Sequence, residues 1–192
     1  VEHNVNEIIS DSGIEIEINI FEGSKQLVER INVKGNTITN ESVIRAELLL
    51  DEGDPYNELK LSKSLSELKA RGIFGEVSKK VSEGSNKDLK VVDINVTEKS
   101  TGEISAGAGI GTSGGNFSFS ISENNWLGQG KRLESFVDVS KTSFKGALSV
   151  SDPNYKNTGN ALSYNITNTK NDKPDSGFEN SIIGAGVGTR FE

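Results

Sequence analysis

Cysteine is absent from this chain of 192 residues, and histidine occurs once, as His3. The absence of cysteine excludes disulfide bonds, thiol catalysis and metal sites with cysteine ligands. His3 lies near the start of the sequence, and no second ligand or nucleophile is placed near it. We therefore interpret it as a terminal surface side chain and not as part of a catalytic or metal site.

Long apolar runs and an excess of basic residues are also missing. No run approaches the about 18 apolar residues of a transmembrane helix. Acidic residues number 28 against 21 basic ones, and the net charge of −7 argues against general nucleic-acid binding. The chain starts without methionine and stops within a repeating pattern at GAGVGTRFE, so we expect a segment of a longer protein.

The composition changes near residue 101. Residues 1–101 contain 32 of the 49 charged residues but only 7 of the 21 glycines. Residues 102–192 are rich in glycine, serine, threonine and asparagine. We therefore expect a domain boundary at TEKSTGE, with a different kind of structure on each side.

The part before the boundary has the patterns of a mixed α+β unit. Alternation predicts a strand over residues 13–23, and from residue 25 the patterns predict the order β-α-α-β-β. The expected elements are a strand at 27–36, a helix from Thr39 or Asn40 to Gly53, a helix from Asn57 to Gly72, and strands around 77–81 and 89–98. This order gives a small sheet with two helices on one side.

The part after the boundary alternates with period 2. About six segments have roughly the 9–11 residues that a tilted strand needs to cross a bilayer. One apolar and one polar face, repeated, suit either a soluble β-sandwich or a membrane barrel with a water-filled lumen. In a barrel, the side chains expected to face lipid are Phe117, Phe119, Ile121, Leu148, Val150, Leu162, Tyr164 and Ile166.

The stretch GAGIGTSGG places Gly109, Gly111 and Gly114 in the order G-x-G-x-x-G. A dinucleotide-binding loop follows a strand and opens a helix, whose N-terminus helps to hold the pyrophosphate. Here the glycines lie within a predicted strand and its turn, and the next segment, NFSFSISE, again alternates with period 2. The context argues against a nucleotide site and predicts glycines on one face of a β-strand.

Three motifs within residues 28–81 resemble those of a POTRA domain. They are Gly35-Asn36, Gly53-Asp54-Pro55-Tyr56, and the L-x-x-x-G-x-F pattern from Leu68 to Phe74. Residues 102–133 and the segment LSVSDPNY resemble the opening strands of the barrel in POTRA-plus-barrel outer-membrane assembly proteins. The resemblance covers nearly the whole chain, and its most specific parts are NNWLGQG and the direct junction between POTRA domain and barrel.

The resemblance implies an α+β POTRA domain (β-α-α-β-β) followed by antiparallel transmembrane β-barrel strands. Residues 1–24 then end a preceding POTRA domain, 25–100 form the last POTRA domain, and 101–192 form about six barrel strands, too few to close. The implied function is not enzymatic: it is the insertion of unfolded β-barrel clients into the outer membrane of a Gram-negative bacterium. The POTRA part is periplasmic, and no cofactor, metal, nucleotide or nucleic acid is required.

The resemblance also implies three kinds of site. The resemblance implies that the first barrel strand, here Glu103–Thr112, opens towards clients. The backbone expected to pair with them belongs to Glu103, Ile104, Ser105, Ala106, Gly107, Ala108, Gly109, Ile110 and Gly111. An accessory lipoprotein is expected to dock at Arg45 and Glu52. An equally good interpretation is that both are ordinary solvated surface charges. Outer-membrane lipid contacts the apolar face, and Trp126 fits either a turn-packing residue or an interfacial anchor.

Three alternatives stay open at this stage. A two-partner secretion transporter and a relative serving autotransporter assembly share the same POTRA-plus-barrel plan. A soluble β-sandwich binding module would show the same alternation. Detergent dependence of the full-length protein separates the sandwich from the others, because a sandwich stays soluble without detergent.

Overall fold

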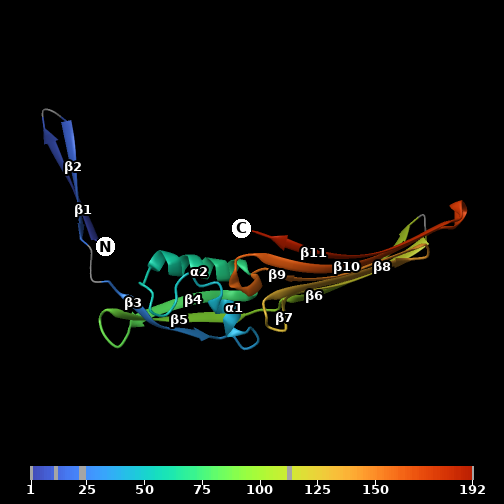
Figure 1. The fold of residues 1–192 in the computed structure, drawn as a ribbon, viewed down its shortest axis with the longest axis horizontal. Helices are drawn as coiled ribbons and strands as arrows, with labels where there is room; N and C mark the ends of the chain where they lie inside the picture. The colour runs from blue at the N-terminus through green and yellow to red at the C-terminus, as the bar shows by residue number, and fades with distance from the viewer. Residues whose placement is uncertain (1, 11–12, 22–24, 112–113, 192) are drawn as a thin grey trace.

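The structure is a computed structural model that describes residues 2–10, 13–21, 25–111 and 114–191 (Figure 1). Its strands form three sheets, in the orders β1-β2, β3-β5-β4 and β11-β10-β9-β8-β7-β6. The elements are β1 (Glu2–Ser10), β2 (Gly13–Phe21), β3 (Leu27–Lys34), α1 (Glu41–Arg45), α2 (Glu58–Ala70), β4 (Phe74–Glu83), β5 (Leu89–Glu98), β6 (Gly102–Gly111), β7 (Gly114–Trp126), β8 (Lys131–Ser140), β9 (Ser143–Asp152), η1 (Tyr155–Asn157), β10 (Ala161–Lys173), η2 (Pro174–Ser176) and β11 (Phe178–Arg190).

The three-stranded sheet and the two α-helices form one module over residues 27–98, called the α+β module below. β3 runs parallel to β5 and β4 runs antiparallel to it, which confirms the predicted order β-α-α-β-β. α2 buries Leu61, Leu65 and Leu68, and Asn57 caps its N-terminus by accepting two backbone N–H groups. Every buried hydrophobic side chain that the structure describes belongs to this module, from Val28 to Val96.

The first helix is shorter than the sequence pattern indicates. α1 covers Glu41–Arg45 instead of reaching Gly53, and Asn40 occupies its N-cap position without a side-chain capping bond. After the helix the backbone tightens into i→i+3 hydrogen bonds, and the Ser64 hydroxyl of α2 then accepts the Leu49 N–H at 2.8 Å. The prediction of a longer helix is wrong because this tertiary partner replaces the helical one.

The six-stranded sheet is an antiparallel meander in which β6 to β11 follow one another in chain order. It confirms the predicted period-2 strands after the boundary. Directly opposite residues of neighbouring strands share a face, so the register sorts the side chains into two faces. Among the side chains described in this sheet, no hydrophobic one is buried.

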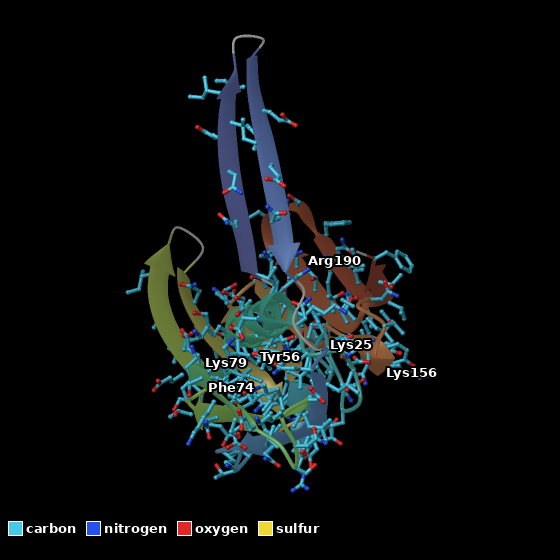
Figure 2. The ribbon with its side chains drawn as sticks, turned by 90° about the vertical axis from the view of Figure 1, so that its left-hand side faces the viewer. Lys25, Tyr56, Phe74, Lys79, Lys156 and Arg190 are labelled. Atoms are coloured by element: carbon cyan, nitrogen blue, oxygen red, sulfur yellow. The ribbon has the colours of Figure 1, made fainter. Side chains whose placement is uncertain are left out.

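The hairpin β1–β2 stands apart from the other elements in Figures 1 and 2. Its second strand confirms the strand predicted over residues 13–23 as far as Phe21, and residues 22–24 lie outside the described residues. In the described part of the chain, no helix combines the length and the apolar character needed to cross a membrane.

Candidate functional site: the edge strand β6 and its surroundings

Strand β6 lies at one edge of the six-stranded sheet. Three residues, 99–101, separate it from β5, the last strand of the α+β module. One side of β6 pairs with β7 over its whole length, and within the described residues its other side has no strand partner. The predicted strand Glu103–Thr112 is present as Gly102–Gly111, and Thr112 lies outside the described residues. Such an edge presents a row of unpaired N–H and C=O groups.

Two glycines of β6, Gly107 and Gly109, face short polar side chains of β7. A Cβ atom added to Gly107 would lie 2.8 Å from Ser118 Oγ, and one added to Gly109 would lie 2.5 Å from Asn116 Oδ1. The space beside each glycine is therefore filled by the end of a flexible side chain and not by a backbone. Gly114, the last glycine of the G-x-G-x-x-G run, opens strand β7 with φ of 101°. The run leads into a strand, whereas a nucleotide loop leads into a helix.

The side chains expected to face lipid all lie on one face of the six-stranded sheet. The register places Ile104 opposite Ile121, and Leu148 opposite Ile166. None of the expected residues is buried: Phe117, Phe119, Ile121, Leu148, Val150, Leu162, Tyr164 and Ile166. The opposite face is mainly polar, although Phe136, Phe178 and Ile182 also lie on it.

Arg45 and Glu52 cover part of the free edge of β3. The Glu52 carboxylate accepts the backbone N–H of Ile31 at 3.0 Å, and the Arg45 guanidinium donates to the Ile31 carbonyl at 2.9 Å. Arg45 also pairs with Glu41 at 2.7 Å, and both Arg45 and Glu52 stay partly exposed. The two charged side chains therefore provide hydrogen-bond partners for the backbone N–H and C=O groups of Ile31 at the sheet edge. Sequence reasoning missed this role because it depends on which strand lies at the edge of the sheet.

Glu58 links the start of α2 to strand β4. It accepts the Tyr56 hydroxyl and pairs with Lys79, and Figure 2 shows the two partners close together in the α+β module. Burial and the neighbouring carboxylate raise the pKa of Tyr56 to about 12. Hydrogen bonds from Lys79 and Tyr56 lower the pKa of Glu58. The described residues contain no group of three or more His, Cys, Asp or Glu placed to hold a metal ion.

Trp126 ends β7 at the turn that leads into β8. It pairs with Lys131 across this turn after an irregularity in the register, and its side chain is 38% exposed. Leu127, the next residue, adopts φ of 55°, which is rare for a side-chain-bearing residue. The turn carries most of the motif NNWLGQG and contacts the α+β module through the carbonyl groups of Gly128 and Gly130.

Residues 26–99 match the POTRA family, described as surface antigen variable number repeat. This match spans the α+β module. The chain is also similar to proteins named outer membrane protein assembly factor BamA. The one from Neisseria meningitidis serogroup B is 31% identical over 155 residues, which cover 80% of this chain and 19% of that protein. The one from Neorickettsia risticii is 32% identical over 131 residues, which cover 68% and 17%. The chain thus matches less than a fifth of the length of these relatives.

The chain is also similar in fold to solved structures. The crystal structure of BamA from Haemophilus ducreyi lacking POTRA domains 1-3 has a TM-score of 0.75 at 23% identity, and covers 97% of this chain and 36% of that one. CdiB from Escherichia coli has a TM-score of 0.59 at 16% identity, with coverage of 97% and 36%. In both cases the likeness concerns an α+β unit followed by antiparallel strands.

Proposed function

This chain is related to the BamA outer-membrane protein assembly factors and carries a POTRA domain at residues 26–99, and from that premise we propose that it inserts β-barrel proteins into the outer membrane of a Gram-negative bacterium. Residues 1–24 end a preceding POTRA domain, 25–100 form the last one, and 101–192 form the first barrel strands. The POTRA part is periplasmic. Insertion depends on the pairing of client strands with the barrel and on docking to the POTRA domain, without catalytic residues or a cofactor.

The observation that carries this proposal is the edge strand β6. An extended segment joins a sheet edge through main-chain hydrogen bonds, and the outer side of β6 offers such groups. The strand consists mainly of glycine, alanine and serine, so side chains do little to fix a single partner. Backbone pairing depends little on the sequence of the client, so the same edge suits many client strands.

Outer-membrane lipid is the partner that suits the exposed apolar face. Phe117 is 69% exposed and Ile166 57% exposed, although both are large apolar side chains. Burial in hydrocarbon is favourable for such a face, while the polar face suits a water-filled lumen. A soluble β-sandwich would cover the apolar face with a second sheet, and no second sheet packs there among the described residues.

An accessory lipoprotein of the assembly machinery is the partner proposed for Arg45 and Glu52. Both lie at the edge of the POTRA sheet and stay partly exposed, so a partner can reach them. Their bonds to Ile31 hold them in fixed positions. A surface of this kind presents a positive and a negative charge in a defined arrangement, which favours one partner over others.

A second candidate function is two-partner secretion, because such transporters share the plan of POTRA domains followed by a barrel. An autotransporter-assembly relative with the same plan is a further alternative. A liposome assay separates these functions: an insertase folds added barrel proteins, whereas a secretion transporter moves only its own partner across the membrane. We favour insertion because the relatives by sequence are assembly factors.

The experiment that tests the proposal locks the edge strand in the full-length protein. One cysteine is placed in β6 and one in the last strand of the barrel, where a disulfide joins the two. We expect the oxidised protein in liposomes to stop inserting an added barrel client, and reductant to restore insertion. Equal insertion rates for the oxidised and the reduced protein would refute the role of β6.

A further inference from the structure

The turn between β7 and β8 docks against the POTRA domain. The Gly128 carbonyl accepts the Asn40 N–H at 2.8 Å, and the Gly130 carbonyl accepts the Arg71 guanidinium at 2.9 Å. These bonds join the turn to the start of α1 and to the end of α2. Arg71 is itself held by Glu47 at 3.5 Å, and both of these side chains are largely buried.

Two polar side chains are buried in the centre of this contact. Thr39 is 2% exposed and Asn125 is 8% exposed. Asn125 Nδ2 donates to Thr39 Oγ1 at 2.8 Å, while Asn125 Oδ1 accepts the Gly130 N–H at 2.8 Å. One side chain therefore closes the turn and binds the POTRA domain at the same time. Because a buried amide left without partners is costly, these bonds favour a single docked geometry.

Glycine allows the turn to approach the POTRA domain this closely. Gly128 and Gly130 adopt φ of 69° and 65°. A Cβ atom on Gly128 would overlap the carbonyl oxygen of Ile38, and one on Gly130 would lie 2.7 Å from the Val43 side chain. The two glycines of the motif NNWLGQG thus serve both the left-handed backbone and the close contact.

The contact extends to the start of the edge strand. Glu98, the last residue of β5, accepts the backbone N–H groups of residues 37–39 at 2.6–3.0 Å and so holds the loop that carries Thr39. Burial alone would raise the pKa of Glu98, but the hydrogen bonds from Thr37 and Thr39 lower it to about 2. On the barrel side, Glu123 accepts the Asn125 N–H at 2.7 Å and the Thr101 hydroxyl just before β6.

We infer that Asn125 is a positioning residue, which holds the POTRA domain in one orientation relative to β6 by joining Thr39 to the β7–β8 turn. The three residues between β5 and β6 cannot fix this orientation alone, because each has two soft backbone dihedrals. The functional consequence of this inference rests on the proposed function. A client held by the POTRA domain meets β6 at a fixed distance only while the contact is closed.

Matched side-chain variants test the contact from both sides. Asn125→Leu removes the bonds to Thr39 and Gly130 while keeping a similar volume. Its control is Gln129→Leu, which replaces an exposed amide of the same turn that bonds only the Lys131 side chain. Thr39→Val removes the hydroxyl from the POTRA side and leaves the sequence of the turn untouched. We expect Asn125→Leu and Thr39→Val, but not Gln129→Leu, to open the contact.

A matched pair of glycine variants separates close approach from turn conformation. Gly128→Ala adds a methyl group that overlaps the Ile38 carbonyl, in addition to the cost of φ at 69°. Gly177→Ala carries a similar backbone cost at φ of 60°, but no atom lies within 4 Å of its new methyl group. We expect only Gly128→Ala to open the contact.

The measurement is a distance distribution in the full-length protein, reconstituted in phospholipid vesicles. Spin labels are attached to cysteines that replace the exposed residues Lys69 of α2 and Lys145 of β9, and this chain has no cysteine of its own. We expect a single narrow distance in the unaltered protein. The undocked population should rise by about 5- to 150-fold in Asn125→Leu. This range is the expected effect of leaving the buried Thr39 hydroxyl and the Gly130 N–H without their partner.

Client insertion is measured on the same samples. A broadened distance together with slower insertion in Asn125→Leu, Thr39→Val and Gly128→Ala, with both controls unchanged, supports the inference. Unbroadened distances in these three variants would overturn it, and so would broadened distances with an unchanged insertion rate. If the unaltered protein inserts no client, the proposed function fails, while the distance measurement still decides whether Asn125 holds the POTRA domain.

Discussion

Replacing Phe119 by arginine tests most directly which face of the six-stranded sheet contacts lipid. Phe119 lies near the middle of the apolar run of β7, between Ala106 of β6 and Val137 of β8 on the same face. An arginine near the bilayer midplane of a β-barrel costs about 2–4 kcal/mol. Since each 1.36 kcal/mol is a factor of ten, this cost lowers the folding equilibrium constant by about 30- to 900-fold.

Ser118→Arg is the matched control at the neighbouring position. Ser118 points to the opposite face, directly across from Asp138, so an arginine there meets water and a carboxylate. We expect its cost to be close to zero. The assay is a urea titration of the folded full-length protein in phospholipid vesicles, with Phe119→Leu to account for the lost ring. Equal losses of unfolding free energy for Phe119→Arg and Ser118→Arg would refute the assignment of the two faces.

Three further predictions concern the POTRA domain and the edge strand. Glu52→Gln keeps an acceptor for the Ile31 N–H but removes the charge. We therefore expect weaker co-purification of the accessory lipoprotein at an unchanged melting temperature. Full recovery of the partner would reject the docking site. Gly109→Pro removes a backbone donor and should stop client insertion into liposomes. Gly109→Ala keeps the donor, and its methyl group meets only the Asn116 side chain, so it should lower the insertion rate only slightly. Equal insertion rates for the two variants would contradict backbone pairing at β6. Because the folded pKa of Glu98 is lowered from 4.5 to about 2, its contribution to stability is complete above pH 4.5 and is lost as the pH falls towards 2. Urea titrations across this range should show a smaller pH dependence for Glu98→Gln, and an unchanged dependence would disprove this role.

The features that sequence predicted well depend on local geometry. Alternation placed Phe117 and Phe119 on one face, because successive side chains of a strand always point in opposite directions. The spacing of Leu61, Leu65 and Leu68 likewise defined the buried face of α2. Both patterns are properties of a short segment and need no knowledge of distant residues.

The features that sequence missed depend on distant partners. α1 ends early because a hydroxyl of α2 binds a backbone N–H beyond it, 15 residues away in sequence. Asn125 and Thr39 lie 86 residues apart, so no local pattern in NNWLGQG reveals that it docks on the POTRA domain. The spacing of its glycines indicated a turn, but not the surface that the turn approaches.

The meander of the six-stranded sheet has a consequence for the order in which a barrel is completed. Each strand from β7 to β11 pairs with the strand made just before it, so each pairing closes a short loop at little entropic cost. The outer edge of β6 is different, because in a closed barrel its partner is the last strand and ring closure must bring together the two ends of the whole domain. A strand that consists mainly of glycine, alanine and serine offers few side-chain contacts to offset that closure. If residues 101–192 open a barrel, as proposed, β6 is the first barrel strand to be synthesised and its outer side is the last to be paired, so a guest strand would compete with the last strand for this edge.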